Sequence, residues 1–141
     1  KDGTKKMSKS ELSDLSRINL TDHKDLIINK IKKAKTDPLP LPSNMKELNE
    51  RPEAKNLLGI YSSLTKTTLD KSINEFEGKN FSEFKEKLSQ VLVEKINPIS
   101  LEIKKLISDK GFLDKILLEG HKKAKDISSN KIKKMHEIIG F

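Results

Sequence analysis

The chain has 141 residues, of which 33% are hydrophobic and 35% charged, and its 29 basic against 21 acidic residues leave a formal net charge of +8. That length suits one domain with a thin core, and that charge suits helices with wide solvated faces rather than a large β-sandwich. The absence of cysteine excludes disulfides, thiolate nucleophiles and cysteine-ligated metals and fits a reducing compartment, so we expect a cytoplasmic protein. No apolar run approaches the roughly 18–20 residues of a membrane span.

The basic residues are almost all lysines: 27 of the 29, with only Arg17 and Arg51 as arginines. Lysine binds phosphate as a point charge, whereas arginine is the better reader of base edges. The excess therefore predicts a polyanionic partner, either a nucleic-acid backbone or a nucleotide. The alternative is that the lysines form solvated helix faces without a partner.

The first 35 residues predict a loop followed by a helix. Residues 1–21 are polar, and 17–20 have the composition of a very short strand. The helix is expected to begin at Thr21 or Asp22, either of which can cap it, and to end near residue 35. Cations crowd its last turns, where the helix dipole favours them, namely Lys30, Lys32, Lys33 and Lys35.

Residues 36–52 predict an extended connection and the best internal boundary. Pro38, Pro40 and Pro42 alternate there, which excludes a helix or a central strand at those positions. The segment is either a plain linker or a strap that fixes the parts on both sides. We favour the strap because Leu39 and Leu41 are placed to pack.

Beyond Pro52 the apolar residues recur in steps of three and four, which predicts helices over 53–64, 67–77, 80–108 and 112–139. Pro98 is expected to kink or break the third of these. Because each helix has a charged face, the apolar stripes must be buried on one another. The predicted fold class is therefore mainly α, a bundle of about four or five helices. The aromatic residues expected in its core are Tyr61, Phe81, Phe84 and Phe112.

A pentamer near the start carries the chemistry: Lys6, Met7, Ser8, Lys9 and Ser10 read KMSKS. From the composition, a chance match in this chain is roughly one in a thousand. The pentamer resembles the nucleotide-loop signature of class I aminoacyl-tRNA synthetases. Lysines and serines suit such a loop, because mobile ammonium and hydroxyl donors stabilise the charge that grows on phosphate oxygens in the transition state.

The resemblance continues in order along essentially all 141 residues and is closest to the bacterial-type tryptophanyl-tRNA synthetases. The segments that carry it are SDLSRINLTD, IKKAKTD, RPEAKNLLGIYSSL, FEGKNFSEFKEKLSQVLVEKINPI and FLDKILLEGHKKAKDISSNKIKKMHEIIGF. The tyrosyl sibling family shares the loop type but offers no match to NLLGIYSSL or to the EGxxKA ending. One departure is Glu11-Leu12, where the family usually has Asp-Pro, which changes the stiffness of the loop.

The resemblance implies the roles of the site residues. Lys6–Ser10 would bind ATP, with Lys9 as the main catalytic contact to the phosphates and Lys6 as a secondary one, and Mg²⁺ would come with the nucleotide. Tryptophan and tRNA(Trp) would be the other substrates. No HxGH-type motif is present, so we expect a piece of a longer ligase that is inactive alone and whose parent forms a homodimer through the missing N-terminal part.

The resemblance also implies three domains. Residues 1–35 would close a catalytic Rossmann domain that lies mostly before Lys1, 36–52 would connect, and 53–141 would be an α-helical anticodon-binding domain. The lysines expected to face tRNA are Lys122, Lys123, Lys125, Lys133 and Lys134. A metal site is not expected, because His121 and His136 have no companion ligands.

Two other functions fit the composition. One is a non-catalytic, basic helical RNA-binding module. The other is an amphipathic helical protein of a membrane surface.

Overall fold

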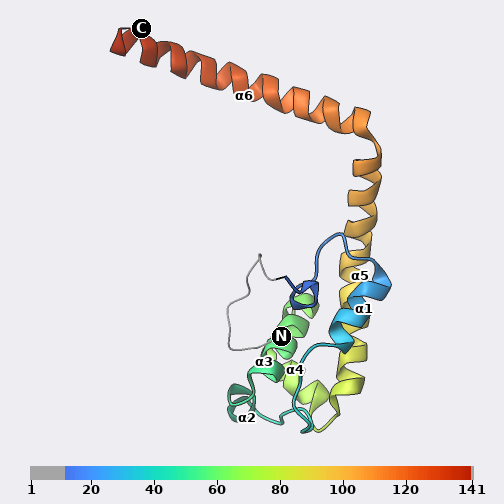
Figure 1. Cartoon of the computed structure of the whole chain (residues 1–141). Coiled ribbons are helices and arrows are strands. Elements are labelled where there is room, and N and C mark those ends of the chain that lie inside the picture. Colours follow the sequence, from blue (N-terminus) through green and yellow to red (C-terminus); the bar gives the residue numbers. More distant parts are fainter. Residues whose placement is uncertain (1–11, 141) are drawn as a thin grey trace. The chain divides into compact units, whose positions relative to one another are not determined.

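A computed structural model describes residues 12–140, and within that range every regular element is a helix (Figure 1). A short 3₁₀ helix, η1, comes first, and six α-helices follow it. Their bounds are η1 Asp14–Ser16, α1 Lys24–Lys32, α2 Met45–Asn49, α3 Pro52–Thr65, α4 Leu69–Phe76, α5 Phe81–Ser108 and α6 Lys110–Ile139. The mainly α prediction is confirmed. Residues 17–20 form no strand, so that part of the prediction is wrong.

The described chain divides into two compact units, one ending at Leu101 and one beginning at Glu102. The division lies inside α5, at a place that the sequence did not indicate. The functional boundaries predicted at residues 35 and 52 remain predictions, because a division by compactness does not test them.

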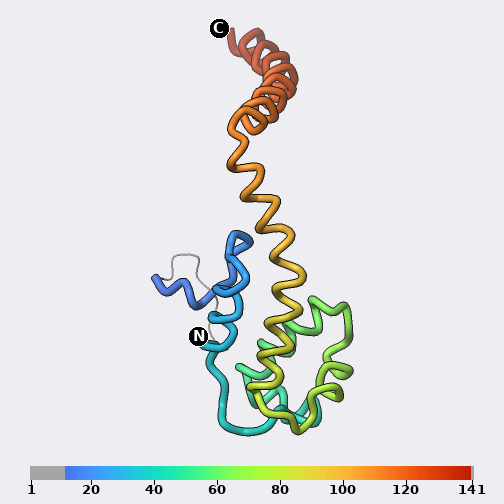
Figure 2. Tube along the Cα trace, turned by 90° about the vertical axis from the view of Figure 1, so that its right-hand side faces the viewer, coloured from blue at the N-terminus to red at the C-terminus, as the bar shows by residue number. Residues whose placement is uncertain are grey.

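The core of the first unit takes residues from all five helices α1–α5. Its buried hydrophobic residues are Ile27, Ile31, Leu41, Leu48, Ala54, Leu57, Leu58, Tyr61, Ile73, Phe76, Phe81, Phe84, Leu88 and Leu92. Figure 2 shows α1 and α4 on opposite sides of the first half of α5. The side chains that α5 contributes recur in steps of three and four, as the sequence predicted.

Three aromatic rings hold α3, α4 and α5 together. The ring centroid of Phe76 lies 4.9 Å from those of Tyr61 and Phe84, and all three rings meet edge to face. Such pairs contribute about 0.5–1.5 kcal/mol each beyond the area they bury. The predicted burial of Tyr61, Phe81 and Phe84 is confirmed, whereas Phe112, in the second unit, is 45% exposed.

The proline-rich segment packs as a strap and contains a helix that the sequence analysis missed. Leu41 is buried, and its backbone N–H donates to Lys79 O at 2.8 Å, while Leu39 remains exposed. The missed helix is α2, whose first turn is capped by Asn44, since its Oδ1 accepts from Glu47 N–H at 2.9 Å. The spacing Asn-x-x-Glu is a local capping signal, and it lies within the segment predicted to be extended throughout.

Arg51 closes the strap. Its guanidinium donates to both carboxylate oxygens of Asp37, at 3.0 and 2.5 Å, and to the backbone carbonyl of Pro40 at 2.6 Å. It also lies 5.6 Å from the centroid of the Phe81 ring. These contacts join the strap to the start of α3 and to α5, as the strap hypothesis requires.

Pro98 does not break α5, which continues without interruption from Phe81 to Ser108. In the second unit, Asp109 caps α6, and its Oδ1 accepts from Phe112 N–H at 3.0 Å. Helix α6 has no buried residue. The apolar stripe of α6 was expected to be buried, but it is not buried within this unit. The only other helical part of the unit is the last turns of α5.

Candidate functional site

The KMSKS motif itself, Lys6–Ser10, lies outside the described residues, as does Glu11. The roles given to Lys6, Met7, Ser8, Lys9 and Ser10 therefore remain predictions. What the structure describes is the chain that directly follows the motif, from Leu12 through η1 to α1, and the helices beyond it.

A tight turn precedes α1 and is held by the side chain of Asp22. The Asp22 N–H donates to Asn19 O at 3.0 Å, and Asp22 Oδ2 accepts from Asn19 N–H at 2.9 Å. The cap of α1 is consequently His23, which makes no side-chain cap bond. The prediction that Thr21 or Asp22 caps this helix is wrong, because the carboxylate of Asp22 is turned back to the preceding loop.

Lys30 donates to two carboxylates at once. Its Nζ lies 2.6 Å from Asp22 Oδ2 and 2.6 Å from Asp14 Oδ2. Lys30 is 3% exposed and Asp22 5%, so this ammonium–carboxylate pair is buried. Burial disfavours the charged ammonium, but the hydrogen bonds that it donates to Asp14 and Asp22 and the charges of these carboxylates together outweigh that cost and raise the pKa of Lys30.

The remaining bonds of Asp14 complete a charge-balanced cluster. Its Oδ1 accepts from Asn19 Nδ2 at 3.0 Å and forms an ion pair with Arg17 at 3.2 Å. The hydrogen bond from Lys30 is the largest of the causes that lower the pKa of Asp14. Two carboxylates thus face two cations, and this balance compensates the two charges that are buried, those of Lys30 and Asp22.

Lys30 is the residue that sequence reasoning most misjudged. The sequence predicts it among the cations that the helix dipole favours in the last turns of α1, yet its side chain is buried in the protein. A local signal existed: Lys30 follows Ile27 by three residues and precedes Ile31, so it lies on the apolar side of α1. The carboxylates that compensate the charge of the buried ammonium come from the preceding loop, and helical periodicity does not reveal them.

A second lysine, Lys85, caps the other end of α1. Its Nζ donates to the backbone carbonyls of Ala34 at 2.6 Å and Lys32 at 3.3 Å. Burial lowers the pKa of Lys85. This side chain from α5 satisfies carbonyls that a helix C-terminus leaves without partners.

The five lysines predicted to face tRNA all lie on α6 and are all exposed: Lys122, Lys123, Lys125, Lys133 and Lys134. Lys122 and Lys133 are 11 residues apart, about three turns, and so lie on one side of the helix, as do Lys123 and Lys134. Such rows of ammonium groups suit contacts to a phosphate backbone. Their role in binding tRNA remains a prediction.

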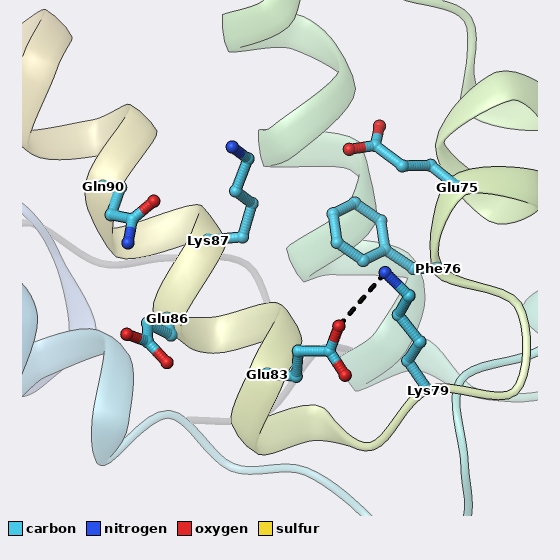
Figure 3. Close-up of a pocket in the computed structure, with 7 residues that line it drawn as sticks. All are labelled: Glu75, Phe76, Lys79, Glu83, Glu86, Lys87 and Gln90. Atoms are coloured by element: carbon cyan, nitrogen blue, oxygen red, sulfur yellow. Dashed lines mark ion pairs between the residues drawn. The ribbon is translucent and has the colours of Figure 1, made fainter.

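A groove between α4 and α5 is a less suitable place for a polyanion (Figure 3). Its charged lining residues are Glu75, Glu83, Glu86, Lys79 and Lys87. Lys79 is already engaged, since its Nζ lies 3.1 Å from Glu83 Oε1 and 5.4 Å from the centroid of the Phe76 ring. Because carboxylates outnumber ammonium groups, this groove repels phosphate rather than attracting it.

Residues 12–140 contain neither a candidate membrane span nor a candidate metal site. No helix in that range is both long enough and apolar enough to cross a bilayer. The same residues contain no cluster of three or more histidine and carboxylate side chains arranged to hold a metal ion.

Comparison with known proteins identifies the class of protein to which the chain belongs. The family model of the tRNA synthetases class I (W and Y) matches residues 1–98, which include the KMSKS motif, the charge-balanced cluster, the strap and α3–α4. The chain belongs to this family.

The individual relatives that the chain matches within this family are tryptophan–tRNA ligases. The whole chain is 47% identical to the tryptophan–tRNA ligase of Rhizobium meliloti (strain 1021), 48% to that of Agrobacterium fabrum and 48% to that of Rickettsia felis. In each case the match covers 100% of this chain but only 40–42% of the relative. The chain thus corresponds to the C-terminal part of tryptophan–tRNA ligases, and the predicted family is confirmed.

Proposed function

We propose that this chain is the C-terminal part of a tryptophan–tRNA ligase. The complete enzyme would join tryptophan to ATP as tryptophanyl-adenylate, with release of pyrophosphate, and then transfer the tryptophanyl group to tRNA(Trp). The observation that carries the proposal is the KMSKS motif at Lys6–Ser10 within a chain that matches tryptophan–tRNA ligases over its whole length.

In this proposal the motif acts on the phosphates of ATP. The carboxylate of tryptophan attacks the α-phosphorus, and the bond to the leaving pyrophosphate breaks. Negative charge grows on the phosphate oxygens as this happens. Lys9, with Lys6 in a secondary role, would place ammonium groups on those oxygens, while Ser8 and Ser10 would donate hydroxyl hydrogen bonds. Contacts that strengthen in the transition state accelerate the reaction.

The donor set of Lys6–Ser10 fits phosphate oxygens and not a bare metal ion, since it contains two ammonium groups and no carboxylate. Mg²⁺ would therefore be held mainly by the phosphates of the nucleotide. It would supply further neutralisation of the charge on those phosphates.

The helical remainder would bind tRNA, and the complete enzyme would be a homodimer through the part that precedes this chain. The net charge of +8 and the two lysine rows of α6 support a tRNA-binding role. A cytoplasmic location follows from this function and remains part of the proposal.

The decisive test is tryptophan-dependent exchange of pyrophosphate into ATP. The full-length protein should catalyse it, and the 141-residue chain alone should not. In the full-length protein, Lys9→Ala should raise the activation barrier by about 2–4 kcal/mol with little change in the affinity for tryptophan. Absence of exchange in the full-length wild type would refute the proposal, and a much smaller effect of Lys9→Ala would refute the role of that lysine.

The lysine rows favour a second candidate, a non-catalytic RNA-binding module. Such a module would bind tRNA as the isolated chain, with an affinity that falls steeply as salt rises. The full-length protein would then show tRNA binding without pyrophosphate exchange, which distinguishes it from the ligase.

A further inference from the structure

We propose that Asp14, Asp22 and Lys30 act together as a positioning cluster for the KMSKS motif. The cluster would fix the chain that leaves the motif to α1, and so determine where Lys9 stands when ATP reacts. This inference rests on the proposed ligase function and assigns a role to three residues outside the motif.

The contacts of the cluster converge on the ammonium group of Lys30. Asp14 lies only four positions after Ser10, whereas Lys30 lies two turns into α1. One ammonium nevertheless bonds both Asp14 and Asp22 at 2.6 Å. Both ends of the segment Asp14–Asp22 are thereby tied to one point on α1.

The hydrogen bonds and ion pairs of the cluster leave residues 14–22 little conformational freedom. Asp22 Oδ2 accepts from both the Asn19 backbone N–H and Lys30, while Asp14 uses one oxygen for Lys30 and the other for Asn19 and Arg17. Sliding the segment by one residue would leave the buried ammonium of Lys30 and the buried carboxylate of Asp22 without partners. Buried unpaired charges are costly, so the cluster favours a single register of this segment.

In the proposed ligase, the register of this segment would affect the rate at which tryptophan reacts with ATP. An ammonium stabilises a phosphate in the transition state only when it arrives within hydrogen-bonding distance, and misplacement by about 1 Å is enough to cost on the order of a hundredfold. Since only four positions separate Ser10 from Asp14, the anchored Asp14 keeps Ser10 within the reach of four peptide units, about 14 Å. Loss of the anchor should therefore lower the rate of the chemical step and leave tryptophan binding unchanged.

The test uses Asp14→Ala in the full-length protein. Because the Asp14 side chain is 47% exposed and the buried Asp22–Lys30 pair is retained, the variant should fold. We expect kcat for tryptophan-dependent pyrophosphate exchange to fall about tenfold or more, with KM for tryptophan within about twofold of wild type. Asp14→Glu, which keeps the carboxylate, should recover part of the loss.

Lys85→Met provides the matched control. It removes another lysine, half-buried, that stabilises α1, but at the C-terminal end of that helix. It should lower the melting temperature at least as much as Asp14→Ala and leave kcat within about twofold of wild type. Equal losses of kcat in the two variants would show that the cluster only stabilises the fold, and would overturn the proposal.

A double-mutant cycle with Lys9→Ala tests whether the cluster acts through the motif. If Asp14 works by placing Lys9, then Asp14→Ala should have little further effect once Lys9 is absent. Additive effects, or exchange by Asp14→Ala within about twofold of wild type, would overturn the inference while the ligase function stands. A wild-type protein without exchange would overturn both.

Discussion

Tyr61 is the only tyrosine of a chain without tryptophan, so its ionisation can be followed by absorbance with no other contributor. The ring is 4% exposed, and its hydroxyl donates to Glu75 Oε1 at 2.9 Å. Burial, then the hydrogen bond to Glu75 and the charge of that carboxylate, raise the pKa of Tyr61 from 10.0 to about 12. We expect the folded chain to show tyrosinate only near the higher value.

This shift makes folding depend on pH. A raised pKa means that the folded chain holds the phenolic proton more tightly than the unfolded chain, so the stabilisation is complete below pH 10 and is lost as the pH rises towards 12. The rise in the pKa of Tyr61 from 10.0 to about 12 corresponds to roughly 2.7 kcal/mol of stabilisation of the folded chain. The free energy of unfolding should therefore fall by up to about that amount across this interval.

The assay is urea unfolding of the 141-residue chain at a series of alkaline pH values, combined with absorbance titration of tyrosinate. Tyr61→Phe is the control, because it keeps the ring and removes only the ionisation; its stability should fall less over the same interval, in which lysines also titrate. Glu75→Gln should move the titration midpoint partway towards 10, since the negative charge goes and the burial remains. A midpoint at the ordinary value in the folded wild type would refute the packing of α3 against α4.

Three further predictions concern the stability of the same chain, measured by urea unfolding. Arg51→Ala should cost about 2–3 kcal/mol at neutral pH. The difference from wild type should shrink as the pH falls below 3.8, because burial raises the pKa of Asp37 but the hydrogen bond and charge of Arg51, together with backbone hydrogen bonds such as that from Leu39 N–H, outweigh it and lower that pKa; a pH-independent difference would contradict this pairing. Phe84→Ala should cost about 3–5 kcal/mol and Phe84→Leu clearly less, and equal losses would show that the aromatic cluster is not tightly packed. Lys66→Gly should stabilise the chain by up to about 1 kcal/mol, because Lys66 ends α3 with a left-handed φ of 56° that glycine adopts without strain, and a loss of stability would argue against that helix end.

Local chemistry in the sequence was enough to predict most helices of this protein. Apolar residues at steps of three and four mark the inward side of α3, α4 and α5, and that spacing survives in the core as Leu57, Leu58 and Leu88. Pro98 was expected to kink or break α5, and the break does not occur, because a proline removes only one backbone hydrogen bond from a helix that here has 28 residues. The KMSKS motif is equally a property of the sequence, since five adjacent residues carry it.

The positions of charges and the partners of apolar faces were decided by tertiary structure. Lys30 is buried only because Asp14 and Asp22 are brought to it from the preceding loop, and that contact between distant residues has no periodic signature. The stripe on α6 was predicted to be buried and is exposed in its unit. Helical periodicity specifies which side of a helix is apolar, whereas the surface that covers that side depends on elements elsewhere in the chain or beyond it.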